Sequence, residues 1–272
     1  MAELKLTGIY IYPIKSAAGI ALEMAQVEKR GFQHDRRWML VDEAGKFITQ
    51  RQFPQMALIS VRLEEDKLVV EAPNRESLSI PIPLDIQPRI SVQVWNDVCD
   101  AIPLGEEVGQ WFSEFLETSC QLVYMPESSL RPVDTRYATQ NEPVSFADGF
   151  PFLLISEASL QDLNERLDEP ISMNRFRPNL VISGCEPFAE DSWDSIRIGT
   201  IAFRVVKPCD RCIVTTVEQT TGIRSKEPLQ TLGRYRRWDG KILFGQNLIA
   251  EQVGTLNLGD SVEINTFASK IS

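Results

Sequence analysis

Short stretches of alternating apolar and polar residues, separated by turn-forming residues, run through most of the chain. The first is LKLTGIYIYPI at residues 4–14, where Ile9 and Ile11 face one side and Tyr10 and Tyr12 the other, as in a half-buried strand. Polar residues at 42–45 predict the turn of a hairpin. Further strands are predicted, from β-branched and aromatic residues between turn signals, at 37–41 with 47–48, 58–63, 68–71, 90–94, 150–155, 179–183, 195–198, 201–206, 213–217 and 261–264.

Two segments have the features of a helix. Between Glu106 and Glu117 the apolar residues recur at i, i+3, i+4, i+7 and i+8, and we interpret this stripe as core packing. Ser156 is a good N-cap for a second helix at 157–167. Residues 124–149 are polar and rich in turns, which predicts a long loop near a domain junction. We therefore expect a mainly β protein with a few helices, without the regular strand–helix alternation of a doubly wound fold.

Composition places the chain among ordinary soluble globular proteins. It has 272 residues, enough for one large domain or two modest ones, with 43% hydrophobic and 24% charged residues. The start of the chain lacks the basic and apolar regions of a signal peptide, and no apolar run approaches the roughly 18 residues that cross a bilayer. We expect a cytoplasmic protein without a membrane partner, with its five cysteines reduced.

The charge balance argues against a nucleic-acid partner. With 28 basic and 38 acidic residues the net charge is −10, whereas surfaces that bind nucleic acids are basic. This balance leaves room for a local basic pocket. Five cations lie beside aromatic or strand residues rather than in surface runs: Lys15, Arg36, Arg175, Arg177 and Arg211. Together with the hydroxyl of Ser16, these cations predict a single anionic ligand.

The only histidine, His34, limits the chemistry available to the protein side chains alone. A Ser-His-Asp triad could use only this imidazole, and a zinc site with several histidines is impossible. A lone histidine in a predicted turn is more often a surface residue than a ligand. Catalysis therefore has to rest on carboxylates, cysteines or an imported cofactor.

The most informative cysteines lie in the segment Lys207-Pro-Cys-Asp-Arg-Cys212. Half a zinc site would need two more ligands, and the other three cysteines supply no second C-x-x-C. A thioredoxin-like redox pair would start a helix, but strands are predicted on both sides of this pair. One of the two cysteines could instead be a small apolar core residue. Arg211 beside Cys212 would favour a thiolate, which is a soft metal ligand.

Seven motifs, in this order along the chain, resemble those of MOSC-domain proteins. They are Tyr12-Pro-Ile-Lys-Ser16, Asp35-Arg-Arg-Trp38, Ser156-Glu-Ala-Ser159, Arg175-Phe-Arg-Pro-Asn179, Asp191-Ser-Trp193, Cys209-Asp-Arg-Cys212 with Thr215-Thr-Val217, and Phe244-Gly-Gln246. Among these proteins, the chain most resembles the mitochondrial amidoxime reducing components and their bacterial relatives, over nearly its whole length. The resemblance implies a mainly β fold with helices (α+β), with a MOSC N-terminal β-barrel-like domain at residues 1–120 and a MOSC β-barrel domain at 121–266.

The resemblance also implies a cofactor and the residues that hold it. The family binds a molybdenum–pterin cofactor (Mo-molybdopterin), a phosphate-bearing pterin dithiolene, with one cysteine thiolate on the metal. The cysteine before Ile213-Val-Thr-Thr-Val217 matches that ligand, so Cys212 is the predicted metal ligand and catalytic residue, and the other four cysteines match no family role. The residues that match cofactor contacts are Lys15, Ser16, Arg36, Ser156, Arg177, Asn179, Asp210, Arg211 and Asn247.

The implied activity is the reduction of N-hydroxylated compounds such as amidoximes, hydroxylamines and N-hydroxylated bases. Some bacterial relatives continue into a ferredoxin domain with a C-x4-C-x2-C run, which this sequence does not contain. We therefore expect a separate electron-donor protein. Two other functions stay open. One is a MOSC protein that carries the cofactor or transfers sulfur without turnover, and the other is a zinc or thiol protein that uses Cys209 and Cys212 together.

Overall fold

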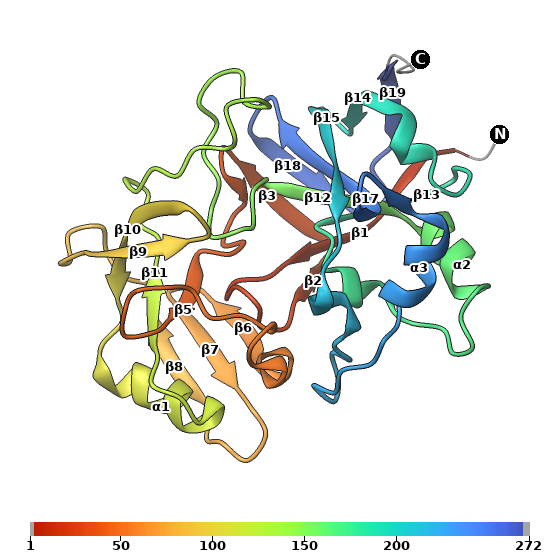
Figure 1. Cartoon of the computed structure of the whole chain (residues 1–272). Coiled ribbons are helices and arrows are strands. Elements are labelled where there is room, and N and C mark those ends of the chain that lie inside the picture. Colours follow the sequence, from red (N-terminus) through yellow and green to blue (C-terminus); the bar gives the residue numbers. More distant parts are fainter. Residues whose placement is uncertain (1–2, 269–272) are drawn as a thin grey trace.

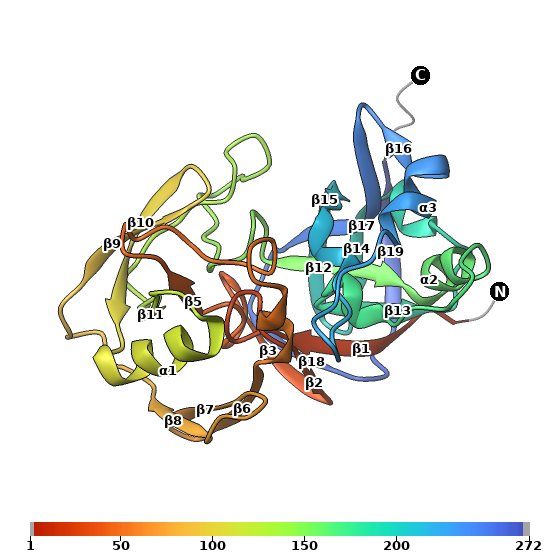
Figure 2. The ribbon, with the colours of Figure 1, turned by 60° about the horizontal axis from the view of Figure 1, so that its bottom comes forward.

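The computed structural model describes residues 3–268, and strands are its main elements. The strands form two groups that lie side by side, at the left and the right of Figure 1. The same two groups are also distinct in the turned view of Figure 2. The prediction of a mainly β structure with a few helices is confirmed.

The right-hand group is built around a nine-stranded sheet that contains both ends of the described chain. Its strands are β1 (Lys5–Ile11), β2 (Ile20–Leu22), β12 (Phe152–Ser156), β13 (Leu180–Ser183), β14 (Trp193–Ile198), β15 (Ile201–Asp210), β16 (Arg237–Trp238), β17 (Lys241–Ala250) and β19 (Val262–Phe267). They follow the order β19-β14-β15-β17-β12-β13-β1-β2, with β16 paired to β17. The pair β12 and β13 is parallel, and β1 pairs antiparallel with β13. A continuous core of buried side chains covers this sheet, including Leu6, Phe152 and Phe203.

The remaining strands form three smaller sheets. A four-stranded sheet has the order β5 (Trp38–Val41), β11 (Gln121–Tyr124), β10 (Asp97–Pro103) and β9 (Ile90–Val94). A three-stranded sheet consists of β6 (Ser60–Glu64), β7 (Lys67–Glu71) and β8 (Leu78–Pro81), and another of β18 (Gly254–Asn257), β3 (Met24–Glu28) and β4 (Gly31–Phe32). Trp38, Leu68 and Phe112 belong to one buried cluster, which joins the first two of these sheets to a helix.

Residues 3–268 also contain three α-helices and four short 3-10 helices. They are α1 (Glu106–Leu116), α2 (Glu157–Asn164), α3 (Leu229–Tyr235), η1 (Pro54–Leu58), η2 (Met173–Phe176), η3 (Ala189–Ser192) and η4 (Ile213–Thr216). The predicted stripe of α1 is buried at Trp111, Phe112 and Leu116, and the helix packs against β11 and β8. Within residues 3–268, no helix is both long and apolar enough to cross a membrane.

Three local predictions differ from the structure. The strand predicted at 213–217 is the 3-10 helix η4, because the hydroxyls of Thr215 and Thr216 donate to the carbonyls of Cys212 and Ile213 and so favour a tight turn over a strand. The second arm of the hairpin at 37–48 is reduced to one bridge between Val41 and Phe47. The helix after Ser156 ends at residue 164 rather than 167.

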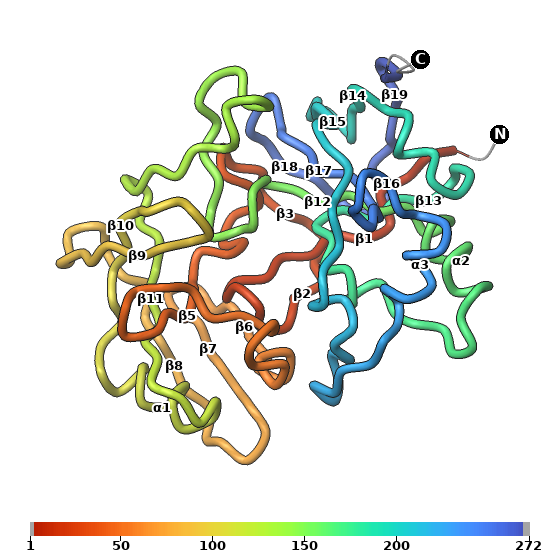
Figure 3. Tube along the Cα trace, in the orientation of Figure 1, coloured from red at the N-terminus to blue at the C-terminus, as the bar shows by residue number. Residues whose placement is uncertain are grey.

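The chain crosses from the right-hand group of strands to the left-hand group near its start, and crosses back before β12. Figure 3 shows the N-terminal trace running from the large sheet into the left-hand group. The strands β1 and β3 pair with β13 and β18, which lie in the second half of the chain. The strand β11 pairs with β10 and β5, which lie in the first half. The loop between β11 and β12 is the predicted long connection. The domain limits 1–120 and 121–266 stay a prediction, and residues 1 and 2 of the first domain lie outside the described residues.

Candidate functional site

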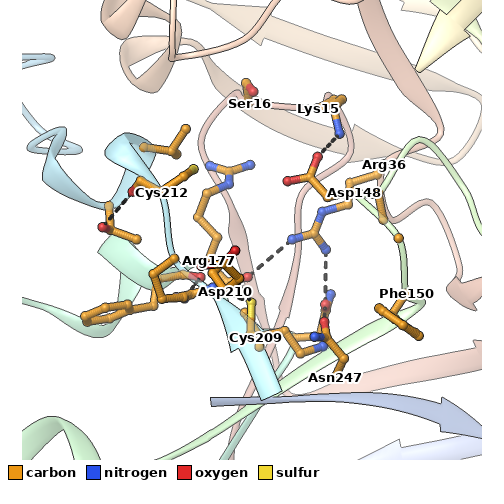
Figure 4. A pocket seen from close by; sticks show the side chains of 18 of the residues that line it. Lys15, Ser16, Arg36, Asp148, Phe150, Arg177, Cys209, Asp210, Cys212 and Asn247 are labelled. Carbon is orange, nitrogen blue, oxygen red and sulfur yellow. Dashed lines mark hydrogen bonds and ion pairs between the residues drawn. The ribbon is translucent and has the colours of Figure 1, made fainter. Parts of the chain in front are cut away.

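A cavity of about 580 Å³ is lined by residues from both halves of the chain. Nine of the ten predicted site residues line it, namely Lys15, Ser16, Arg36, Arg177, Asn179, Asp210, Arg211, Cys212 and Asn247. Figure 4 shows several of these side chains around the cavity. The structure therefore brings together residues that are more than two hundred positions apart in the sequence.

The lining of the cavity is strongly basic although the whole chain is acidic. Seven cationic side chains line it: Lys15, Arg36, Arg51, Arg175, Arg177, Lys207 and Arg211. The carboxylates in the lining are Asp148 and Asp210. Concentrating cations in one concave site produces a local positive potential that attracts anions, whatever the net charge of the molecule.

Lys15 enters the cavity wall from the segment that follows β1. It is 5% exposed, and its Nζ donates to the carbonyl of Phe146 at 2.7 Å and to Oδ1 of Asp148 at 2.6 Å. Burial lowers the pKa of Lys15 to about 8, and the Asp148 carboxylate opposes that shift. Ser16 follows with a positive φ of 70°, and its carbonyl accepts a hydrogen bond from Gln50.

Two arginines pack near the ring of the buried Tyr12. The guanidinium carbon of Arg36 lies 4.6 Å and that of Arg177 4.2 Å from the ring centroid. Arg36 donates to Asp35 at 2.6 Å and to Oδ1 of Asn179 at 3.1 Å. Burial works against the charge of Arg36, but Asp35, Tyr12 and Asp148 together outweigh it, and the pKa of Arg36 is raised. Burial lowers the pKa of Arg177 to about 10.

The two cysteines of the C-x-x-C segment have different arginine partners. Cys212 is the N-cap residue of η4, and its Sγ lies 3.2 Å from Nη2 of Arg51. Arg211 instead donates to Sγ of Cys209 at 2.9 Å. The expectation that Arg211 stabilises the Cys212 thiolate is therefore wrong, because the Arg211 side chain extends toward Cys209 and the carbonyl of Phe176. Arg51, from the first half of the chain, takes that position.

Ser156 is the predicted site residue that the structure does not bring to the cavity. It is fully buried and caps α2, where its Oγ accepts a hydrogen bond from the backbone N–H of Ser159 at 3.1 Å. Its own N–H donates to Oε1 of Glu190 at 3.1 Å. Ser156 does not reach the cavity because its hydroxyl is buried in a hydrogen-bond network with Ser159, whose own hydroxyl donates to Glu190.

Several residues that line the cavity were not among the predicted site residues. They include Arg51, Trp95, Asp148 and Lys207. Arg51, Trp95 and Asp148 interact with one another: the Arg51 guanidinium carbon lies 4.6 Å from the Trp95 ring centroid, and Trp95 Nε1 donates to Asp148 at 3.2 Å. No local sequence motif marks these three residues.

The donor groups of the cavity fit an anionic ligand rich in oxygen. Within residues 3–268, three buried nitrogens of lining arginines have no hydrogen-bond partner, namely Nε of Arg175, Nη2 of Arg177 and Nε of Arg211. Buried donors without partners are costly, so native proteins rarely leave them unsatisfied. A phosphate or pterin edge would supply the missing acceptors.

The same part of the chain contains no cluster of three or more His, Cys, Asp or Glu side chains arranged for a metal. Zinc sites in proteins usually need three or four such ligands. A metal that receives its other ligands from an organic cofactor needs only one protein thiolate. Two thiol side chains line the cavity, those of Cys209 and Cys212.

The class of protein to which this strand architecture and basic cavity belong is identified by comparison with family models. Models of two families match the chain: the MOSC N-terminal beta barrel domain over residues 3–119, and the MOSC domain over residues 141–263. The chain belongs to the MOSC family.

Its similarity to individual proteins covers nearly the whole chain. The mitochondrial amidoxime-reducing component 1 of Mus musculus is 39% identical over 274 residues, covering 93% of this chain and 80% of that protein. The mitochondrial amidoxime reducing component 2 of Rattus norvegicus is 38% identical, with coverage of 93% and 81%. The component 1 protein of Homo sapiens is 36% identical, also with coverage of 93% and 81%. The chain is therefore related to the amidoxime-reducing components.

Proposed function

We propose that the cavity binds a molybdenum–pterin cofactor and that the thiolate of Cys212 is the protein ligand of the metal. One observation carries the proposal: the cavity that contains this thiol is lined by seven cations, and three of their guanidinium groups have a buried nitrogen without a partner in the described structure. The relatives of this chain are named amidoxime-reducing components, which supports a reductive function for the cavity.

The residues of this chain would hold the cofactor by its charged and polar edges. In this proposal Lys15, Arg177 and Arg211 neutralise the phosphate, and Ser16, Arg36 and Asn179 bind the pterin; all six line the cavity. Asp210 and Asn247 complete the polar lining. When bound, the cofactor supplies two-electron redox chemistry at the metal, while the protein provides orientation and electrostatics.

The activity that we propose is the reduction of N-hydroxylated compounds. For an amidoxime the balanced reaction is R–C(NH2)=N–OH + 2e⁻ + 2H⁺ → R–C(NH2)=NH + H2O, so that the N–O bond breaks and its oxygen leaves as water. The two electrons come from a separate donor protein. The alternative within the same fold is a cofactor carrier or sulfur-transfer protein, which binds the cofactor and reduces no such compound.

Metal content tests the assignment of the thiol. In protein made by a host that synthesises the cofactor, we expect molybdenum near one atom per chain by mass spectrometry. Cys212→Ser should lower this content by roughly tenfold or more, since even changes outside the ligand shell cost metal proteins about that much affinity. Cys209→Ser is the matched control and should keep the metal. Loss of molybdenum in Cys209→Ser alone would show that the other sulfur is the ligand, and zinc in place of molybdenum would contradict the proposal.

Turnover separates the reductase from the carrier. Benzamidoxime and a chemically reduced dye are added to the molybdenum-loaded protein, and benzamidine is quantified. We expect benzamidine from the wild type and about none from Cys212→Ser. A loaded wild-type protein without turnover would support the carrier function instead.

A further inference from the structure

Asp148 is one of the two carboxylates that line the cavity, and only one of its two oxygens accepts hydrogen bonds from the described residues. It lies at the end of the long loop between β11 and β12, and its side chain is 61% exposed. Lys15 and Trp95 both donate to the same oxygen, Oδ1, at 2.6 Å and 3.2 Å. Among residues 3–268, no group donates a hydrogen bond to Oδ2, which can therefore accept one from a ligand.

The free oxygen of Asp148 is close to the proposed metal ligand. One nitrogen, Nη2 of Arg51, lies 3.2 Å from Sγ of Cys212 and 3.7 Å from Oδ2 of Asp148. A single guanidinium nitrogen thus separates the thiol from the carboxylate. A small molecule whose reacting group is next to the metal of Cys212 therefore has Asp148 within reach.

The carboxylate is held in place and kept ionised. Arg131, which is 2% exposed, donates to the carbonyls of Ser145, Ala147 and Asp148 and to the carboxylate of Asp97 at the start of β10. These bonds tie the Asp148 loop to the hairpin that carries Trp95. Although burial works in the opposite direction, Lys15 and Arg51 hold the pKa of Asp148 below its ordinary value.

Trp95 provides an apolar surface beside this carboxylate. Its ring lies against Arg51 and has its centroid 5.0 Å from that of Phe47, while 42% of the residue stays exposed. It occupies the tight turn between β9 and β10 with a positive φ of 56°. A tryptophan held in this strained conformation at the cavity wall gives a planar substrate a surface to pack on.

We propose that Asp148 is a specificity-determining residue, whose Oδ2 accepts a hydrogen bond from an N–H group neighbouring the N–OH of the substrate. This selects N-hydroxylated amidines and guanidines, which carry such an NH2 group on the adjacent carbon, over oximes and dialkylhydroxylamines, which do not. The inference rests on the proposed reductase function and narrows its substrate class.

The discrimination follows from the chemistry of a charged acceptor. A hydrogen bond to an ionised carboxylate stabilises a complex more than a neutral one does, whereas an analogue without the donor covers the carboxylate and gives it no hydrogen bond. Replacing NH2 by CH3 keeps the shape of the substrate and removes the donor. The comparison of benzamidoxime with acetophenone oxime therefore isolates this one contact.

The experiment uses the molybdenum-loaded protein and its Asp148→Asn variant. The affinity of each for benzamidoxime and for acetophenone oxime is measured calorimetrically without reductant, and kcat/KM is measured with a reduced dye. We expect the wild type to prefer benzamidoxime by roughly tenfold or more in both measurements. In Asp148→Asn this ratio should fall toward one, because benzamidoxime binds more weakly while the affinity for acetophenone oxime stays the same.

The matched control is Glu65→Gln, which removes one negative charge from the exposed turn between β6 and β7 and should leave the ratio unchanged. A wild type that loads molybdenum but does not distinguish the two compounds overturns the inference, as does an Asp148→Asn variant that keeps the wild-type ratio. Should Asp148→Asn fail to load the metal, the wild-type ratio and an Asp148→Ser variant decide. Failure of the proposed function itself is distinct, since then the wild type contains no molybdenum or reduces neither compound.

Discussion

The cavity lowers the pKa of Lys15 into a range where its effect on stability can be measured. Burial lowers its pKa from the ordinary 10.5 to about 8. Between these two values the folded protein has already released the proton while the unfolded chain still holds it. Because the unfolded state then binds more protons, the free energy of unfolding rises with pH across this window.

A Lys15→Met variant isolates that contribution. We expect the free energy of unfolding of the wild type, minus that of the variant, to increase between pH 8 and pH 10 by at most about 1.4 kcal/mol per pH unit. Urea denaturation of both proteins at several pH values measures this difference, and the subtraction cancels the other titrating groups. A difference that is constant or falls with pH would contradict the lowered pKa.

Among the single elements, the helix α2 is stabilised at its start by the N-cap residue Ser156. The hydroxyl of Ser156 and the carboxylate of Glu190 satisfy polar groups that would otherwise be buried without partners at the start of this helix. Burial raises the pKa of Glu190, which is 1% exposed. A motif that resembles a cofactor contact therefore serves the stability of the helix.

The prediction for this helix is that Ser156→Ala lowers the free energy of unfolding by about 1–2 kcal/mol, the usual cost of losing an N-cap. Molybdenum content per folded chain should stay at the wild-type level. Chemical denaturation and metal analysis of the same preparations test the two statements together. Loss of metal at unchanged stability would show that Ser156 belongs to the cofactor site.

For the whole molecule, the cavity and the large sheet both depend on the two halves of the chain. Lys15, Arg36 and Arg51 come from the first half, and the other four lining cations come from the second. In the large sheet, β1 pairs with β13, and its Leu6, Ile9 and Ile11 are buried in the same core as β12 and β15. The division into two sequence families is therefore not a division into two separable structures.

A fragment that begins at residue 121 is accordingly expected not to fold. Without β1 the strand β13 has an unpaired edge, and the core loses three large apolar side chains, each contributing about 1.5–3 kcal/mol on burial. Circular dichroism and amide-proton dispersion in NMR spectra of the fragment test this expectation. Cooperative unfolding of the isolated fragment, comparable with that of the full chain, would contradict it.

Local sequence patterns predicted most of the elements. The alternation at 58–63 and 68–71 is the hairpin of β6 and β7, and the stripe at 106–117 is α1, because each pattern reports the burial of one face over a few residues. The pattern failed at 213–217, where β-branched threonines predict a strand. There, hydrogen bonds from their hydroxyls to the chain three residues earlier outweigh that preference.

The sequence by itself determined the strand-rich fold, its family and nine of the residues that line the cavity, since these are expressed in short motifs. The tertiary structure alone decided the contacts between distant segments. It placed Arg51 rather than Arg211 against Cys212, and Ser156 inside the fold. It also placed the carboxylate of Asp148 near the same Arg51 nitrogen that contacts the thiol. The reason is geometric: an arginine side chain is long enough to reach several partners, and only the packing of both halves selects one of them.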